Sequence, residues 1–380
     1  MEAMDKLAAH VRGRVAEWSK QKKEGKKLIG YTPGDFVPED MITAVGACAI
    51  PIMRGGSHEA VAESAAYIPR FIDTFCRSQI GHRMLGDDPL YQMVDRVVVT
   101  LTDNNTRAIG DAFDFFAGLK TYRLGVPHQR DEISTEYFLV GLRLFRDWLE
   151  EVTGNKLDEA KLKKEIELTN KILDLLGKIS ELRKSPNPPI TGRQVIQLQH
   201  ASYYGDKAVV AECLQAIYDG LKGKQGPKPA ARLLLTGSTL ADGDYKVYDL
   251  AEAAGAVIVA EEFAEGMRHY WHKINLDGGD VLAALADRYF TRRVPPAWWR
   301  PHAKEKISFL KDLAKDYAVD GVIWYNLMYR DSYDIQYFYF AKQIETDMGL
   351  KTLKILSDYD TSEIVPMRTR VEAFVETLSR

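Results

Sequence analysis

Residues 321–330, GVIWYNLMYR, decide the fold. The apolar run 322–326 predicts a short buried strand, and a polar turn then leads into an aromatic helix over 333–344. A second apolar run, 352–356, ends in the polar sequence Ser357-Asp358-Tyr359-Asp360. Buried strands that are followed directly by charged residues are typical of an open parallel α/β sheet. In such sheets ligands bind at the carboxyl ends of the strands.

The same rhythm of strand and helix recurs in two parts of the chain. Apolar runs predict strands over 27–31, 47–53, 97–101 and 121–126, and again over 232–235, 256–259, 322–326 and 352–356. We therefore expect an α/β protein of two lobes, each with a four-stranded parallel sheet flanked by helices. The expected divisions are an N-terminal helical arm (1–26), a first lobe (27–134), a helical connector with a linker (135–229) and a second lobe (230–380). Helices are also predicted over 70–85 and from Arg368 onward.

Composition narrows the class of protein. A length of 380 residues suits two or three domains, and a hydrophobic content of 46% suits packed cores. The formal net charge of −3 gives no electrostatic reason to expect nucleic acid or an anionic membrane as a partner. No apolar run reaches the roughly 18 residues that a membrane span needs. The first residues lack the apolar segment of a signal peptide, so we expect a cytoplasmic protein.

Three cysteines are too few for a four-thiolate cluster within one chain, and they form no CxxC pair. Cys48 lies in an apolar strand and Cys213 within a helix, so both are expected in the core. Cys76 alone has polar neighbours, although a single thiol beside an arginine is more often inert than reactive.

Polar residues at predicted strand ends are the candidates for a site. Thr236-Gly237-Ser238 lies between a strand and a helix, where backbone amides can approach a ligand; the alternative is a simple turn with Asp244 as a helix cap. The stretch matches neither a P-loop nor a dinucleotide fingerprint, so no nucleotide is expected on this chain. Glu261-Glu262 could act as acid and base, but a structural ion pair with Arg268 is favoured.

Two further groups are singled out. Arg330, Asp331, Asp358, Asp360, Arg368 and Arg370 follow neighbouring strands and could form one polar cluster, either a site or a salt-bridge network. Trp298-Trp299-Arg300 follows two prolines. This patch could stack on an adenine or lie at a subunit interface, and the interface is favoured.

Five segments resemble one known family. They are IPRFIDTFCRSQIG (68–81), VVVTLTDNNTR (97–107), LLLTGSTLADGDYKVYDLAEAAGAVIVAEEFAEGMRHYW (233–271), DGVIWYNLMYRDSYD (320–334) and LKILSDYDTSEIVPMRTRVEAFVE (353–376). In this order they resemble the family that joins the smaller subunits of benzoyl-CoA reductases to the β subunits of 2-hydroxyacyl-CoA dehydratases. The resemblance implies two flavodoxin-like lobes and an iron–sulfur cluster held by three cysteines. This chain has Asp73, Thr102 and Arg330 at those three positions, and Ala264 at a further frequent cysteine.

The resemblance implies an oxygen-sensitive, ATP-dependent reductase acting on benzoyl-CoA or a related aromatic acyl-CoA, of which this chain is the smaller family-type subunit. The alternatives are the β subunit of a 2-hydroxyacyl-CoA dehydratase or a non-catalytic scaffold. Implied partners are a second family-type subunit in a pseudo-symmetric heterodimer, which would hold a [4Fe-4S] cluster, and ATP-hydrolysing activator subunits. Cys76 is a candidate iron ligand. The expected catalytic residues are Arg330, Asp331 and Asp358, and the expected substrate-binding residues are Thr236, Gly237, Ser238, Trp298, Arg300 and Arg368.

Overall fold

Two parallel four-stranded sheets organise the chain, as the sequence predicts. The structure is a computed structural model that describes residues 2–34 and 36–378. The first sheet has the order β2-β1-β3-β4 and the second has the order β6-β5-β7-β8, so both lobes share one topology. The strands are β1 Leu28–Tyr31, β2 Cys48–Pro51, β3 Arg96–Leu101, β4 Thr121–Gly125, β5 Arg232–Gly237, β6 Val257–Glu262, β7 Gly321–Leu327 and β8 Lys351–Ser357. This confirms the predicted fold class, because the shared order is that of a doubly wound sheet.

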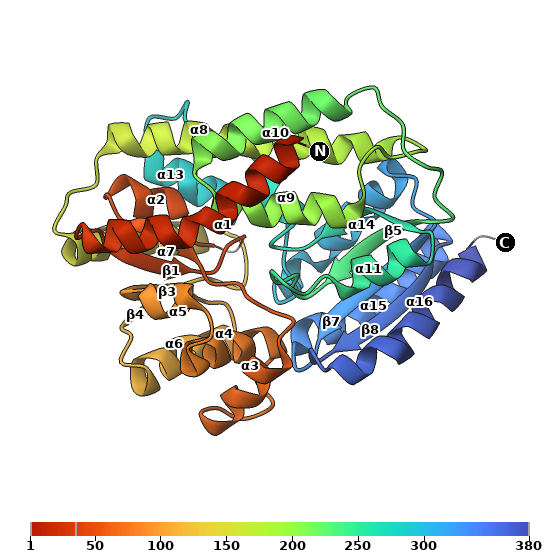
Figure 1. The fold of residues 1–380 in the computed structure, drawn as a ribbon, viewed down its shortest axis with the longest axis horizontal. Helices are drawn as coiled ribbons and strands as arrows, with labels where there is room; N and C mark the ends of the chain where they lie inside the picture. Colours follow the sequence, from red (N-terminus) through yellow and green to blue (C-terminus); the bar gives the residue numbers. More distant parts are fainter. Residues whose placement is uncertain (1, 35, 379–380) are drawn as a thin grey trace.

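Helices cover both sheets (Figure 1). The first lobe contains α2 Glu39–Ala44, α3 His58–Glu63, α4 Thr74–Leu85, α5 Pro89–Met93 and α6 Asn104–Phe116. The second contains α11 Lys246–Ala253, α12 Met267–Tyr270, α14 Ala303–Asp316, α15 Asp331–Met348 and α16 Ile364–Leu378. Helix α13 Val281–Ala286 comes from the same part of the sequence but packs against α7 and the core of the first lobe (Figure 1). Between the two sheets in the sequence come α7 Glu132–Thr153, α8 Glu159–Glu181, α9 Gly192–Tyr204 and α10 Lys207–Leu221, and α1 Glu2–Lys23 precedes them all.

The long helix α8 ties the lobes together. It packs against α2 of the first lobe and against α12 of the second, with α10 beside it along the same edge of the molecule (Figure 1). Its inward residues are apolar at helical spacing, as the sequence predicts for this region. The two strand-bearing lobes are therefore held in one arrangement by a shared helical layer.

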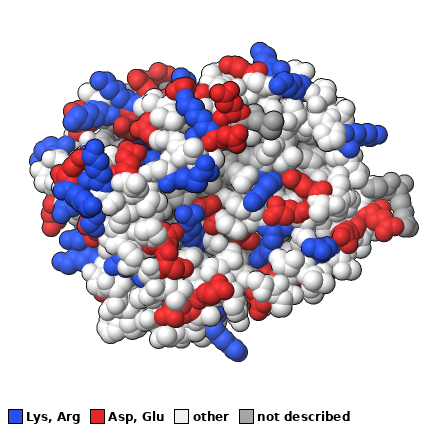
Figure 2. Space-filling model, in the orientation of Figure 1, with Lys and Arg blue, Asp and Glu red and all other residues white. Residues whose placement is uncertain are grey.

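Burial explains why the central strands are the clearest in the sequence. Every residue of β5 and β7 is buried, since helices cover both faces of a parallel sheet. The edge strands β4 and β8 are only partly buried and carry more polar residues. Among the described residues, no helix is long and apolar enough to cross a membrane. Figure 2 shows basic and acidic side chains interspersed over one face, in keeping with the small net charge.

Several predicted boundaries are wrong. Helix α4 begins at Thr74 rather than at residue 70, because the Asp73 side chain caps it. Helix α16 begins at Ile364, which places Arg368 beyond its first turn. Strand β6 runs on to Glu262, so the two glutamates lie within the strand and not after it. Helix α5 has no counterpart among the predicted elements.

Two local interpretations also differ from the structure. Asp244 does not cap α11, whose N-cap is Tyr245. Trp298 and Trp299 are not an exposed patch, because both are buried in the core of their own chain against Phe36. The indole of Trp299 also donates a hydrogen bond to the carbonyl of Pro127, at 2.9 Å. These tryptophans therefore join the second lobe to the first. The role of Trp298 in substrate binding stays a prediction.

Candidate functional site at the junction of the lobes

The carboxyl ends of β7 and β8 point their polar residues at the first lobe. After β7 the chain turns through Tyr329, with φ of 65°, and reaches Arg330. After β8 it passes Asp358 and turns through Tyr359, with φ of 61°. A left-handed conformation costs a residue other than glycine about 1 kcal/mol. Both turns thus have a strained backbone next to a charged side chain. Strained backbone conformations cluster at functional sites, where the direction of a side chain is important.

Arg330 binds the caps of two helices in the other lobe. Its Nη1 atom lies 2.7 Å from Asp73 Oδ2 and 3.1 Å from Asp103 Oδ2. Asp73 caps α4 by accepting a hydrogen bond from the backbone of Cys76, and Asp103 caps α6 through a capping box with Thr106. Burial acts to lower the pKa of Arg330, but the two carboxylates outweigh it and raise that pKa well above its ordinary value. The guanidinium is therefore a permanent cation between two anions.

Asp358, which follows β8, also binds the N-terminus of α4. Its Oδ1 atom accepts a hydrogen bond from the Thr74 hydroxyl at 2.7 Å and lies 3.4 Å from Arg77 Nη1. The backbone NH of Thr74 donates to the carbonyl of Met328 at 3.3 Å. The N-terminus of α4 is thus held by both β7 and β8, and Arg330 and Asp358 belong to one inter-lobe network.

A small cavity of about 40 Å³ lies beside this network. Pockets for organic ligands measure about 300–1,000 Å³, so this one has room for roughly one or two waters. Arg268 lies in its wall, 3.0 Å from Glu262 through Nε and 3.2 Å from the Tyr333 hydroxyl through Nη1. Burial lowers the pKa of Arg268, and Glu262 more than offsets this effect, so the side chain stays charged. The cavity wall brings together Thr102, Ser238, Ala264, Trp298 and Arg330.

The small residues predicted to follow β5 serve packing, and two of them, Thr236 and Gly237, lie within the strand itself. A Cβ atom at Gly237, where φ is 144°, would lie 1.7 Å from the carbonyl oxygen of Tyr325, so only glycine fits. The Thr236 hydroxyl donates to Glu262 at 2.7 Å, and the Ser238 hydroxyl accepts the backbone NH of Leu327 at 2.9 Å. Of the three, Ser238 also reaches the wall of the cavity.

Other predicted site residues lie away from the network. Asp331 is exposed in the first turn of α15, although it adjoins Arg330 in the sequence. Arg300 and Arg368 are also exposed. Sequence reasoning missed the roles of Asp73 and Asp103 as partners of Arg330. The signal available for them was their position, since an aspartate before a helix is a typical N-cap, but nothing local indicates a third partner.

Cys76 is buried directly behind the Arg330 network. Its side chain is fully shielded from solvent, and burial together with the Asp73 carboxylate raises the thiol pKa well above its ordinary value. A thiol must lose its proton to ligate a metal. Within residues 2–34 and 36–378, no three side chains of His, Cys, Asp or Glu lie together as metal ligands. The role of Cys76 as an iron ligand stays a prediction.

Glu261 and Glu262 each meet a buried cation. Glu261 pairs with Arg183 and accepts a hydrogen bond from the Tyr270 hydroxyl at 3.0 Å. Glu262 pairs with Arg268, which is the ion pair that the sequence analysis favours. Glu262 also lies 3.2 Å from Lys306. Burial lowers the pKa of Lys306 to about 8. The two glutamates thus belong to two separate ion-pair networks.

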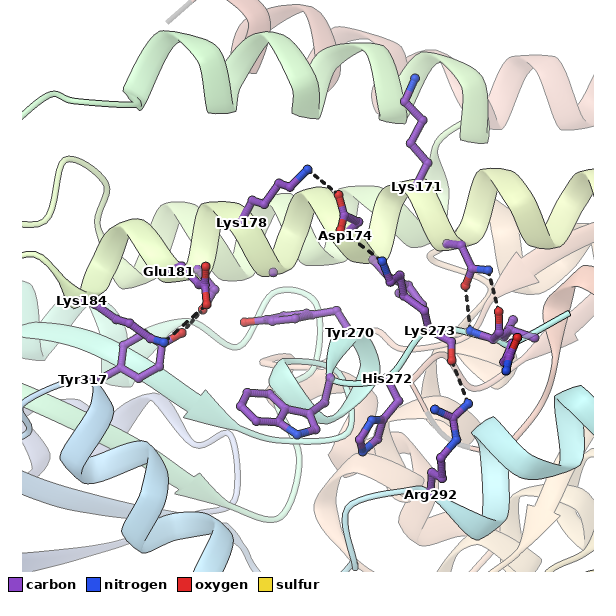
Figure 3. Close-up of a pocket in the computed structure, with 17 residues that line it drawn as sticks. Lys171, Asp174, Lys178, Glu181, Lys184, Tyr270, His272, Lys273, Arg292 and Tyr317 are labelled. Carbon is purple, nitrogen blue, oxygen red and sulfur yellow. Dashed lines mark hydrogen bonds and ion pairs between the residues drawn. The ribbon is translucent and has the colours of Figure 1, made fainter. Parts of the chain in front are cut away.

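A groove of about 980 Å³ opens elsewhere, between α8 and the chain that follows α12 (Figure 3). Asp174, on α8, lies 2.7 Å from Lys178 and 3.3 Å from Lys273. Near the C-terminal end of the same helix, Lys184 pairs with Glu181 at 3.4 Å. The described residues that line this groove include none of the predicted site residues. Since its carboxylates face its own lysines, we assign no ligand to it.

The fold and the junction define a class: a doubly wound α/β protein of two lobes whose strand ends meet across one polar contact. Comparison with known proteins narrows this class. The family model described as 2-hydroxyglutaryl-CoA dehydratase, D-component, matches residues 36–378. The chain therefore belongs to the family of 2-hydroxyacyl-CoA dehydratase and benzoyl-CoA reductase subunits, as the sequence motifs predict.

Some relatives are named as dehydratase subunits and others as reductase subunits. The chain is 23% identical over 357 residues to the (R)-phenyllactyl-CoA dehydratase beta subunit of Clostridium sporogenes, a match that covers 93% of this chain and 92% of that protein. It is also 23% identical over 315 residues to a subunit of the benzoyl-CoA reductase of Thauera aromatica, a match that covers 81% of this chain and 79% of that one. The family thus includes subunits of dehydratases and of reductases.

Proposed function

We propose that this chain is the subunit of a hetero-oligomeric acyl-CoA enzyme that does not carry the iron–sulfur cluster of that enzyme. The observation that carries this proposal is the Arg330 guanidinium, held between Asp73 and Asp103. Resemblance to the family puts cluster cysteines at positions 73, 102 and 330. A carboxylate, a hydroxyl and a cation there do not fit a four-iron cluster, which binds thiolates. We assign the [4Fe-4S] cluster to the partner subunit.

The partner would be a second family-type subunit in a pseudo-symmetric heterodimer located in the cytoplasm. ATP-hydrolysing activator subunits would supply it with electrons. The relatives, whose names describe them as subunits, support a hetero-oligomer. The kind of partner and the activator subunits follow from the resemblance of the motifs. In this arrangement the present chain completes the cleft for the acyl-CoA and contributes to the docking surface.

Arg330 and Asp358 act within this chain by positioning. Two carboxylates already neutralise the Arg330 guanidinium, so little of its field is left for a substrate anion. The small cavity beside it also leaves no room for an acyl-CoA in this arrangement of the lobes. The network fixes the N-terminus of α4, and with it the surface that the junction presents to a partner. This favours a positioning role over direct catalysis by Arg330, Asp331 or Asp358.

The reaction of the assembled enzyme is either net reduction of an aromatic acyl-CoA or dehydration of a 2-hydroxyacyl-CoA. The resemblance of the motifs leads us to place the reductase first, with benzoyl-CoA as substrate. Products distinguish the two. The assembled enzyme, given reductant and ATP, should convert benzoyl-CoA to a dihydro product and leave phenyllactyl-CoA unchanged. Formation of an unsaturated acyl-CoA from phenyllactyl-CoA would establish the dehydratase instead.

Anaerobic iron and acid-labile sulfide analysis tests the assignment of the cluster. We expect no iron in this chain purified alone and iron in its complex with the partner. Iron near four atoms per chain in the isolated protein would overturn the proposal, and the Cys76→Ala variant would then show whether that cysteine holds it. The Asp358→Asn variant adds a second readout, since a positioning role predicts weaker assembly and a catalytic role predicts an intact complex without turnover.

A further inference from the structure

Helix α7 is apolar on two faces. Its inner stripe, Phe138, Leu142, Phe145 and Leu149, is buried against the first lobe. A second stripe faces solvent: Ile133, Tyr137, Val140 and Leu144 are 82%, 58%, 41% and 57% exposed. Scattered exposed apolar residues are ordinary, but four on one side of one helix form a continuous surface that is unfavourable in water. We call these four residues the outer stripe.

The outer stripe has the spacing of a coiled coil. Its members are separated by four, three and four residues, which is the a/d repeat that packs against a second helix. With Tyr137 and Leu144 at a positions, Ile133 and Val140 occupy d positions. The stripe ends at the next d position, which is Asp147. It is therefore a short seam of four residues, about 16 Å long at 1.5 Å per residue.

The residues that flank the seam indicate its occupant. Glu136 and Arg143 are the two g positions, and Ser134 and Gly141 are the two e positions. In an antiparallel pair of helices, g positions face g positions, so Glu136 of one copy meets Arg143 of the second copy, and the reverse pair forms by symmetry. Within one chain these two side chains already attract each other, at 3.2 Å. The seam is thus self-complementary in charge, as a two-fold interface must be.

We propose that two copies of this chain associate through antiparallel contact of their α7 outer stripes. Ile133 of one copy then packs near Leu144 of the second copy, and Tyr137 near Val140 of the second copy. A seam this short buries less than a standard interface of about 1,600 Å², so the dimer is weak and concentration-dependent. The proposal does not depend on the proposed function, since this chain alone can dimerise whatever its partner subunit is.

Sedimentation equilibrium of the full-length chain, alone and in its complex, tests this contact. The wild type should dimerise reversibly, and Leu144→Glu should weaken dimerisation about 100-fold by placing a charge in the apolar seam. The matched control is Val365→Glu on α16, a residue 69% exposed outside the stripe, which should leave dimerisation unchanged. Circular dichroism checks that both variants fold.

Charge reversal tests the antiparallel orientation. Either single variant, Glu136→Arg or Arg143→Glu, places like charges opposite each other at both symmetry-related contacts between positions 136 and 143. Each should weaken the dimer about tenfold. The double variant, E136R with R143E, should restore wild-type affinity. The proposal is overturned if the wild-type chain does not self-associate alone and its complex contains one copy of it. It is also overturned if the double variant does not recover the dimerisation affinity of the wild type. If Leu144→Glu releases a different subunit from the complex and leaves self-association of this chain unchanged, the proposal is also overturned.

Discussion

Nη1 of Arg330 lies 2.7 Å from Oδ2 of Asp73, and the two residues come from different lobes. Because Asp73 also caps α4, one carboxylate serves a local and a long-range purpose. Asp103 does the same for α6. The relative placement of the two sheets therefore depends on a cation from one lobe that neutralises two helix caps of the other.

Replacing Arg330 with methionine should lower the free energy of unfolding by about 3 kcal/mol, because the buried carboxylate of Asp73 and the partly buried carboxylate of Asp103 would lose their shared cation. Urea denaturation at neutral pH measures the change. Arg107 provides a matched control, since its pair with Asp111 is largely exposed. Arg107→Met should change stability by less than about 0.5 kcal/mol.

A second substitution separates loss of charge from loss of packing. In the Arg330→Met background, Asp103→Asn removes one of the stranded carboxylates and should recover part of the lost stability. If the double variant were no more stable than Arg330→Met, the guanidinium would not be acting through its charge.

The Arg183–Glu261 pair should behave differently when both partners are removed. Both side chains are fully buried. Arg183→Met leaves an unpaired carboxylate and should cost about 3–5 kcal/mol, whereas Arg183→Met combined with Glu261→Met should recover most of that loss. Denaturant titration of the wild type and these two variants measures how much of the loss is recovered. Equal losses in the single and double variants would mean that the cost arises from packing rather than from charge.

Most of the fold is predictable from the sequence, because buried parallel strands are continuous apolar runs and helices keep a 3.6-residue period. The strand β6 is predicted too short for a physical reason. Glu261-Glu262 looks like a strand end, and only distant partners such as Arg183, 78 residues away, make two buried glutamates acceptable within it.

The candidate site is less predictable, because its contacts are long-range. Arg330 and Asp358 are identifiable as polar residues at strand ends. Their partners are not, since Asp73 lies 257 residues from Arg330 and Thr74 lies 284 residues from Asp358. The sequence also cannot show that Trp298 packs inside its own chain, because an aromatic pair after two prolines has the composition of an interface as well as that of a core.

The three cysteines should be unreactive in the folded protein. Cys48, Cys76 and Cys213 are all buried, and burial raises the thiol pKa of each. Reaction with a disulfide reagent at pH 8 should release almost no chromophore from the native chain and close to three equivalents in denaturant. Fast reaction of one thiol in the native protein, lost in Cys76→Ala, would show that the junction opens in solution.

His200 should make stability fall in mild acid. It is buried in α9, where its Nδ1 lies 2.8 Å from the Tyr245 hydroxyl, and burial lowers its pKa from 6.5 to about 4. Between these values the unfolded chain binds a proton at His200 and the folded chain does not. Stability from this group is therefore complete above pH 6.5 and is lost as the pH falls toward 4, by up to about 3 kcal/mol.

The His200→Gln variant isolates this effect, because glutamine keeps a polar contact with Tyr245 and does not titrate. Urea unfolding at pH 7.5, 5.5 and 4.5 measures both proteins, and carboxylates that titrate in the same range contribute equally to each. The wild type should lose more stability than the variant as the pH falls, so the difference between them narrows or reverses. Parallel losses across the whole range would mean that His200 is protonated in the folded chain, most directly through Asp242, whose carboxylate lies 3.9 Å away.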